Sequence, residues 1–268
     1  MRIQLLGTGG ADGIPAYCAS GLVSDYAREH GGKDVRTRAA ALVDGELKID
    51  FGPDTLAQIQ RDGIDASDWS AAVFTHSDED HLAVSELQYF LYPFNENDHL
   101  PFAIYGNAEI CRIIRQRYPD WPMEIHETKA FESFRHAGFT ITPILANHTI
   151  KEEAHNLIVE RDGRKLIYAT DTGVWCHQTF DFVKGAQANA LVIECTDAFK
   201  KSTYNGHLDI AECVGMVHRL HELDGLTQDA RVVTTHHSHQ GGARHCDLVK
   251  ALGRFAIEPG YDGMEFDV

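Results

Sequence analysis

The stretch FTHSDEDHLAVSEL, which runs from Phe74 to Leu87, places two histidines and three aspartate or glutamate side chains on one short turn. The apolar residues 71–74 lead into this turn and predict a buried strand. Ionisable side chains at such spacing would repel one another, and burying them without a partner would cost stability. A cation at their centre reverses that cost, so the turn is a candidate metal site.

A simpler interpretation of the turn is that it only caps a following helix. Ser and Asp commonly cap helices, and the sequence predicts a helix with an aromatic side over Val84–Phe94. Capping accounts for Ser77 and one aspartate. It does not account for His76 and His81, which enclose the carboxylates between them. We therefore favour metal binding over capping alone.

Composition and charge limit the kinds of molecule that this chain is expected to bind. The chain has 268 residues, of which 43% are hydrophobic, and its 24 basic and 40 acidic residues give a formal net charge of -16. A chain this acidic is not expected to bind a nucleic-acid polymer or an anionic membrane. A small phosphorylated substrate would need local positive charge, which metal ions can supply. The sequence leaves the oligomeric state open, a homodimer included.

Cysteine usage and segment lengths indicate a cytoplasmic enzyme. The six cysteines are scattered, without a C-x-x-C pair, so reduced thiols are expected. The apolar run near the N-terminus is too short for a signal peptide, and no stretch reaches membrane-spanning length. Because the sequence contains no low-complexity linker, heptads or clear repeat, we expect a single domain over residues 1–268.

Short apolar runs separated by turn residues predict two series of strands with helices between them. The dipeptide Asp44-Gly45 is typical of a type I′ hairpin turn. The whole pattern predicts an α/β fold of two sheets flanked by helices. The predicted strands are 3–6, 39–43, 47–51, 71–74, 102–105, 139–145, 156–160, 165–170, 190–194 and 232–235, and the predicted helices are 56–61, 84–94, 108–117 and 210–223.

The glycine-rich segment GTGGADG, residues 7–13, is also compatible with a dinucleotide site. It lacks the G-x-G-x-x-G spacing, and Ile14-Pro15 follows it where a helix would be needed. We therefore expect a tight structural turn near the functional site.

Three further predicted strands end in the same residue types as the opening stretch. His148 follows the apolar run 144–146, Asp171 follows 166–169, and His236 follows the strand at 232–235. Strands that end in His or Asp deliver ligands to one edge of a sheet. Together with the opening stretch they give seven candidate metal ligands: His76, Asp78, Asp80, His81, His148, Asp171 and His236.

In these positions the sequence resembles the metallo-β-lactamase superfamily, whose signature is H-x-H-x-D-H followed by distant His, Asp and His ligands. Six of the seven candidates match by residue type and order, whereas Asp78 stands where the family has its second histidine. Within the superfamily the likeness is greatest to the PhnP-type cyclic phosphodiesterases of the carbon-phosphorus lyase pathway. It extends over almost the whole chain, through LLGTGGADGIPA, ITPILANHT, ATDTG, TTHHSHQ and GYDGMEFDV.

This resemblance implies an αββα four-layer sandwich, with two sheets between layers of helices and a two-metal site at one edge. The first divalent ion would be held by His76, Asp78 and His148, and the second by Asp80, His81 and His236. Asp171 would bridge the two ions. Ions roughly 3.5 to 4 Å apart can activate a water and neutralise a phosphate. Such a site reconciles an acidic protein with an anionic substrate.

We assign two residues to catalysis, His207 and the ligand Asp80. By the resemblance, His207 in YNGHLDI matches the position proposed to protonate the leaving group, and an ordinary histidine pKa of about 6.5 suits that task. The alternative is a histidine that caps the next helix or is simply solvated. Asp50 and Asp54 are candidates to accept a hydrogen bond from a metal-bound imidazole. Asp50 is favoured, with turn capping as the alternative for both.

Two departures from the family pattern carry information. PhnP-type proteins bear a structural zinc on a cluster of N-terminal cysteines and a late histidine. Here only Cys18 and His239 match, too few for a tetrahedral site, so we expect no structural zinc. Asp78 contributes a hard oxygen donor, which shifts preference toward Mn(II) or Fe(II) relative to zinc. The flavodiiron branch of the superfamily also carries a carboxylate at this position and binds two irons.

The sequence therefore favours a metal-dependent phosphodiesterase that cleaves a small cyclic phosphate or nucleotide-like ester by metal-bound hydroxide, with His207 as general acid. Its cofactors would be two divalent ions: Mn, Zn or Fe. One alternative is a dinuclear iron redox protein of the flavodiiron-like type, disfavoured because no flavin-binding module follows in this chain. Another is a degenerate member that only binds a ligand. No cationic side chain is assigned to the substrate; those nearest the motifs in sequence are Arg36, Arg38, Lys151 and Arg244.

Overall fold

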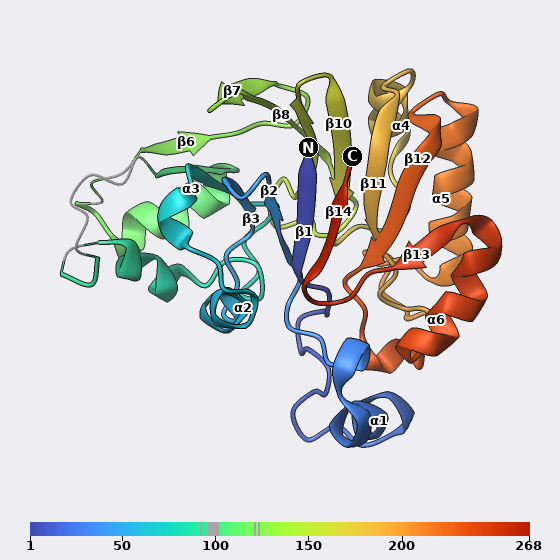
Figure 1. Ribbon diagram of the computed structural model, residues 1–268. Helices are drawn as coiled ribbons and strands as arrows, with labels where there is room; N and C mark the ends of the chain where they lie inside the picture. The colour runs from blue at the N-terminus through green and yellow to red at the C-terminus, as the bar shows by residue number, and fades with distance from the viewer. Residues whose placement is uncertain (92, 96–101, 121, 123) are drawn as a thin grey trace.

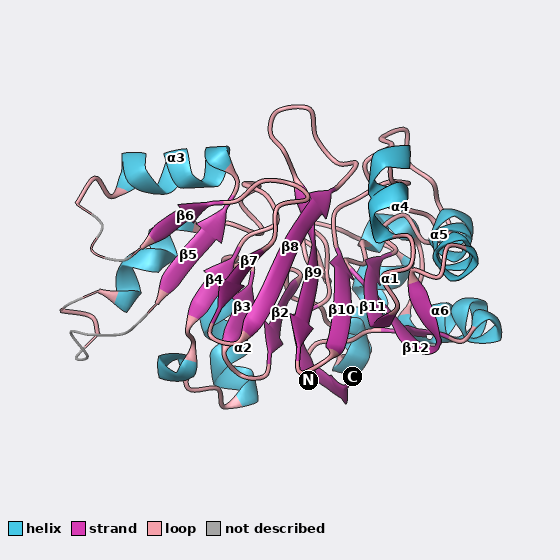
Figure 2. Ribbon diagram, turned by 90° about the horizontal axis from the view of Figure 1, so that it is seen from above, coloured by secondary structure: helices cyan, strands magenta, loops and turns pink. Residues whose placement is uncertain are grey.

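Two seven-stranded β-sheets pack face to face, and helices cover the outer face of each sheet (Figures 1 and 2). The structure is a computed structural model that describes residues 1–91, 93–95, 102–120, 122 and 124–268. The arrangement is the αββα sandwich, of the α/β class, that the sequence predicted.

The first sheet has the strand order β14-β1-β2-β3-β4-β5-β6. Its strands from β14 to β3 pair antiparallel, and those from β3 to β6 pair parallel. The predicted hairpin turn joins β2 to β3, and both Asp44 and Gly45 have positive φ there. The strands are β1 (Arg2–Gly7), β2 (Ala40–Val43), β3 (Leu47–Ile49), β4 (Ala71–Val73), β5 (Ala103–Gly106), β6 (Ile125–Glu127) and β14 (Met264–Asp267).

The second sheet has the order β13-β12-β11-β10-β9-β8-β7. Here β10 to β13 pair parallel, and β7 to β10 pair antiparallel. The strands are β7 (Phe134–His136), β8 (Phe139–Leu145), β9 (His155–Arg161), β10 (Arg164–Ala169), β11 (Ala188–Glu194), β12 (Leu226–Thr235) and β13 (Ile257–Pro259).

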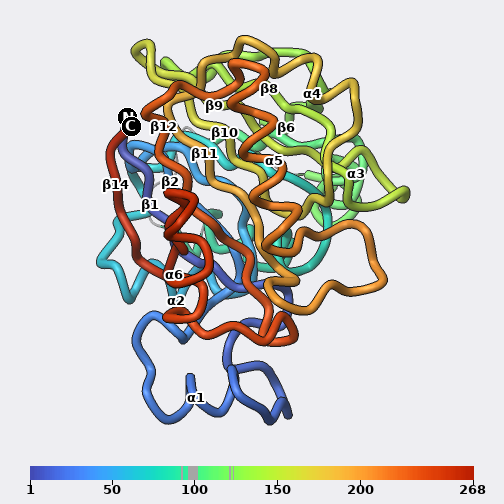
Figure 3. The backbone as a smooth tube through the Cα atoms, turned by 90° about the vertical axis from the view of Figure 1, so that its right-hand side faces the viewer, coloured from blue at the N-terminus to red at the C-terminus, as the bar shows by residue number. Residues whose placement is uncertain are grey.

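Helices α2 (Thr55–Asp62) and α3 (Ala108–Arg117) lie on the first sheet, and α4 (His177–Val183), α5 (Ile210–Glu222) and α6 (His245–Leu252) lie on the second. Helix α1 (Leu22–His30) belongs to a small lobe at one end of the molecule, away from the two chain termini (Figures 1 and 3). In the described part of the chain, no helix is long and apolar enough to cross a membrane.

The apolar core forms three layers because side chains alternate between the two faces of each strand. Leu47 and Ile49 of β3 are fully buried between the two sheets. Lys48, which lies between them in sequence, is also fully buried, and its ammonium group lies over the rings of Phe51 and Trp69 in the core under α3. A lysine therefore occupies an outer-core position that an apolar residue would normally fill.

Most predicted elements are confirmed, and α3 and β8 have the predicted bounds. The helix predicted over Val84–Phe94 is wrong in type and length: residues Val84–Phe90 form a 3₁₀ helix, and residue 92 lies outside the described residues. Leu91 is already extended, two residues before Pro93, whose ring cannot continue a helix. Helices α1, α4 and α6 and strands β6, β7, β13 and β14 were not predicted.

Candidate metal centre

The carboxyl ends of strands from both sheets bring the candidate ligands to one edge of the sandwich. From the second sheet, His148 follows β8, Asp171 follows β10 and His236 follows β12, and these three strands point the same way. From the first sheet, the opening stretch that starts at His76 follows β4. The sequence prediction that these strand ends meet is consistent with this topology.

The chain leaves several of these strands through a left-handed backbone conformation. Asp50 after β3, Asp171 and His236 have φ of 57°, 47° and 55°. Such a conformation costs a residue other than glycine about 1–3 kcal/mol and is most often found at functional sites. Hydrogen bonds and packing around these strand ends must offset that cost.

Two triads of side chains at this edge lie close enough together to hold a metal ion each. One consists of His76, His148 and Asp171, and the other of Asp80, His81 and His236, with the ligand atoms of each triad within 4.8 Å of one another. The Asp171 oxygens lie 3.0 Å from His81 Nε2 and 3.1 Å from His236 Nε2. Asp171 therefore lies between the two groups.

Three of the imidazole nitrogens that face this centre lack hydrogen-bond partners, whereas His148 Nε2 has one in Asp78. The Nε2 atoms of His76, His81 and His236 are buried and unsatisfied among the described residues. An unpaired buried nitrogen costs about 1–3 kcal/mol, whereas a divalent cation is a favourable partner for imidazole and carboxylate together. The donor set thus fits divalent metal ions.

The opposite ring nitrogen of each histidine is held, which fixes the nitrogen that faces the centre. His81 Nδ1 lies 2.7 Å from Asp50, whose oxygens also accept from the backbone N–H and hydroxyl of Thr75. Thr75 and Thr196 hydroxyls lie 3.0 and 2.9 Å from Nδ1 of His76 and His236. Asp50 therefore supports a candidate ligand, while Asp54 does not: it pairs with Arg38.

Asp78 lies on the side of the first triad and is more exposed than the rest of the cluster. Its Oδ2 lies 3.3 Å from His148 Nε2 and 3.6 Å from His76 Nε2, and 55% of its side chain is accessible. The hydrogen bond from His148, followed by the nearby His76 imidazole, lowers the pKa of Asp78 well below its usual range. The carboxylate is therefore ionised and directed at the same two nitrogens that the sequence analysis grouped with it.

The Asp171 carboxylate and the neighbouring His81 imidazole shift one another's pKa values. Burial raises the pKa of Asp171, but the charges of His236 and His81 outweigh it and hold that pKa well below its usual range. Burial lowers the pKa of His81, but Asp171 and Asp80 outweigh it and raise the pKa. In the absence of metal, the raised pKa of His81 favours a proton that offsets part of the carboxylate charge. A metal ion would take over that role and release protons.

His207 lies beside both groups and is held by a glutamate that the sequence analysis missed. Its ring centroid lies 5.2 Å from that of His148 and 5.3 Å from that of His236. Its Nδ1 lies 2.9 Å from Oε1 of Glu194, which is fully buried at the end of β11. Burial lowers the pKa of His207, but the hydrogen bond and charge of Glu194 outweigh it and raise the pKa to about 9.

Glu194 connects His207 to both halves of the cluster. It accepts hydrogen bonds from the backbone N–H groups of Thr172, next to Asp171, and of Leu208. It also accepts from the Thr196 hydroxyl that contacts His236. The sequence held a signal for it, because LVIE is an apolar run ending in an acid, as the strands before Asp171 and His148 end in a ligand type.

The remaining residues named from the sequence lie around this centre. A Cβ on Gly10 of the glycine-rich segment would come within 3.3 Å of the His236 ring, so that turn is near the site as expected. Arg36 is buried and donates to Thr8 and to the Gly260 carbonyl. Arg244 pairs with Asp247, His239 pairs with Asp12, and Cys18 is exposed.

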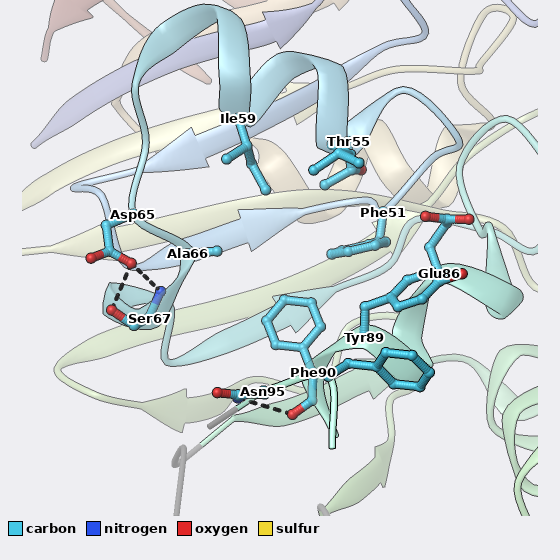
Figure 4. Close-up of a pocket in the computed structure, with 12 residues that line it drawn as sticks. Phe51, Thr55, Ile59, Asp65, Ala66, Ser67, Glu86, Tyr89, Phe90 and Asn95 are labelled. Atoms are coloured by element: carbon cyan, nitrogen blue, oxygen red, sulfur yellow. Dashed lines mark hydrogen bonds between the residues drawn. The ribbon is translucent and has the colours of Figure 1, made fainter. Parts of the chain in front are cut away.

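A hollow of about 360 Å³ lies elsewhere, between α2 and the 3₁₀ helix Val84–Phe90 (Figure 4). Its described lining is mainly apolar and aromatic, with Ile59 on one wall and Tyr89 and Phe90 on the other. It contains none of the candidate ligands. The metal-binding chemistry therefore belongs to the strand ends, and this hollow is a separate feature.

The chain belongs to the β-lactamase superfamily, whose domain matches residues 47–237. The matched residues run from β3 to just beyond β12 and include all seven candidate ligands. No curated protein matches the chain in sequence.

Solved structures share the fold over the full length of the chain. A diphosphatase from the PhnP family is 20% identical, with a TM-score of 0.79, and the match covers 100% of this chain and 97% of that one. Zn²⁺-bound PqqB from Methylobacterium extorquens is 17% identical, with a TM-score of 0.77 and full coverage of both chains. The short form of human tRNase Z is 18% identical, with a TM-score of 0.69 and coverage of 100% and 99%.

Proposed function

We propose that this protein is a metal-dependent hydrolase that cleaves a small phosphodiester, such as a cyclic phosphate or a nucleotide-like ester. The observation that carries the proposal is the pair of His and Asp triads around Asp171, with the His207–Glu194 pair beside them. Two of the similar structures, a diphosphatase and tRNase Z, are named for chemistry on phosphate compounds, which supports a phosphate ester as the substrate.

The residues around Asp171 are those that would hold two divalent ions. We assign His76, Asp78 and His148 to one ion and Asp80, His81 and His236 to the other, with Asp171 shared. Ions bound there would supply Lewis acidity and an activated water at neutral pH. Because Asp78 contributes oxygen in place of a histidine nitrogen, we expect Mn or Fe to compete with Zn.

His207 is positioned to give a proton to the departing alkoxide. Glu194 accepts at Nδ1, so Nε2 is left free to donate toward the reacting group. In the metal-free protein, Glu194 raises the pKa of His207, which favours the protonated imidazole that a general acid requires. After the proton leaves, the imidazole stays hydrogen-bonded to Glu194 and can be reprotonated by solvent, since 18% of its side chain is exposed.

We propose a small phosphorylated substrate, without a nucleic-acid polymer or a membrane as partner. The net charge of -16 disfavours a polyanion. Three of the four basic residues near the motifs are engaged elsewhere, since Arg36 binds Thr8 and Gly260, Arg38 binds Asp54, and Arg244 binds Asp247. The charge that draws the phosphate to the site therefore comes mainly from the metal ions and His207.

A substrate panel with metal-reconstituted protein tests this function. We expect turnover of cyclic and linear phosphodiesters that requires added divalent metal, with slower turnover of a phosphomonoester and of a β-lactam. Preferential cleavage of an RNA chain would contradict the small substrate. Oxygen consumption that depends on a reductant, without ester hydrolysis, would instead favour the dinuclear iron redox alternative.

Replacing Asp78 by histidine tests whether this carboxylate is a ligand. Because Asp78 faces His76 and His148, D78H exchanges a hard oxygen for a softer nitrogen at the first ion. We expect competition between Zn and Mn to move toward Zn while the circular dichroism of the fold stays unchanged. An unchanged ratio of bound Zn to Mn would show that the Asp78 side chain does not contact the ion.

A further inference from the structure

His148 is held differently from the other candidate histidine ligands. The groups that fix His76, His81 and His236 belong to buried residues at strand ends. His148 Nδ1 instead lies 3.3 Å from the backbone carbonyl of Gly206, in the loop between β11 and α5. The orientation of this one ligand therefore depends on a loop between elements, in which Gly206 is buried and residues 201–205 are exposed.

Tyr204 in the same loop makes a second contact with His148. Its hydroxyl donates to the backbone carbonyl of His148 and lies 3.5 Å from His148 Nδ1. Its ring centroid is 5.7 Å from that of His148 and 5.5 Å from that of His207. The tyrosine thus contacts the segment that carries a metal ligand and the residue proposed as general acid, although 46% of it is exposed.

Hydrogen bonds and close packing hold the loop around Tyr204 on both sides. The Ser202 N–H donates to Asp197, and the Ser202 hydroxyl donates to the Tyr204 carbonyl. A Cβ on Gly206 would come within 2.5 Å of the Tyr204 ring, so the glycine permits this close packing. Beyond His207 the chain enters α5 through a capping box between Asp209 and Glu212.

We infer that Tyr204 is a positioning residue. Its hydroxyl joins the segment that carries His148 to the loop that carries His207, and we call this contact the clasp. The clasp couples binding of the first ion to placement of the general acid. This inference rests on the proposed function. This role explains why the hydroxyl of an exposed tyrosine donates a hydrogen bond to the backbone carbonyl of a candidate ligand. Partners of this kind orient a ligand, and losing one typically costs roughly 10- to 100-fold in metal affinity.

The test is a metal titration of Y204F, which removes only the hydroxyl. Metal-free parent and variant are titrated with Zn²⁺ in competition with a chromophoric chelator. We expect one class of ion to bind roughly 10- to 100-fold more weakly in Y204F and the other to be unchanged. H148A identifies the weakened class as the ion that His148 holds. Y17F, at a tyrosine that is 86% exposed, serves as the matched control and should titrate like the parent.

A thermal melt separates a clasp from a structural role. The melting temperature of the metal-free Y204F protein should equal that of the metal-free parent, because the clasp acts on ligand placement. Equal weakening of both ion classes, or no weakening of either, would overturn the role of Tyr204. If the parent itself binds no Zn²⁺, the failure lies with the proposed function, and the titration of the parent shows it directly.

Discussion

The H207A variant should hydrolyse a phosphodiester with a poor, alkoxide-type leaving group roughly 10²- to 10⁴-fold more slowly than the parent, with its metal content intact. The reason is that an alkoxide needs a proton as it departs, and His207 is held by Glu194 with Nε2 available to donate it. A nitrophenyl ester has a leaving group that needs no proton. Turnover of that ester should hardly change in the same variant.

The comparison of leaving groups is what makes this prediction specific. H221A, at an exposed histidine of α5, is the matched control and should behave like the parent on both esters. Equal losses on both esters in H207A would remove His207 from the role of general acid. Loss of metal from H207A would instead make it a ligand, which its place in a third group with Asp171 and His236 allows.

The K48M variant should be more stable than the parent at pH 7, by roughly 2 to 5 kcal/mol. The Lys48 side chain is fully buried, and among the described residues no carboxylate forms an ion pair with it; its Nζ donates to the backbone carbonyls of Ile49 and Asp50. Burial lowers the pKa of Lys48 from 10.5 to about 7, with Asp50 opposing the shift in part.

The pH dependence follows from the sign of that shift. Between about pH 7 and 10.5 the unfolded chain binds more protons at Lys48 than the folded chain does. The free energy of unfolding of the parent should therefore rise with pH across this window, and lose that gain as pH falls toward 7. In K48M this contribution is absent, so the advantage of the variant should shrink to nearly nothing at the upper end.

Denaturant unfolding of K48M and parent at several pH values between 7 and 10.5 measures this difference. K250M, at an exposed lysine of α6, is the control for removing one positive charge. Parallel curves for parent and K48M would mean that Lys48 is charged in the folded protein throughout. A lower stability of K48M at every pH would mean that its two carbonyl contacts outweigh the cost of burial.

Local patterns in the sequence predicted two sheets flanked by helices and polar strand ends at one edge, while the resemblance to the metallo-β-lactamase superfamily implied the αββα sandwich. Apolar runs of strand length that are followed by His or Asp can be recognised in the sequence alone, as before His148 and Asp171. Parallel strands then bring their ends together whatever the residues between them. A polar residue directly after a buried apolar run therefore predicts both the end of a strand and a side chain of the site.

Features that depend on three-dimensional neighbours were less accessible from the sequence. Glu194 ends a strand as Asp171 does, yet its role follows from contacts with Thr172, Thr196 and His207, which no spacing reveals. Lys48 gave no sign that it would be buried, since its strand is short. The 3₁₀ helix that replaces a predicted α-helix is likewise set by its surroundings, with Pro93 close beyond its end.

The measurement that tests the central claim most directly is the metal content of protein purified without chelator, set beside that of D171A. The account predicts about two divalent ions per chain in the parent, as a site with one shared carboxylate requires. Because Asp171 contacts the histidines of both groups, D171A should lose most of both ions. A parent that binds no metal, or one ion that D171A retains in full, would contradict the account.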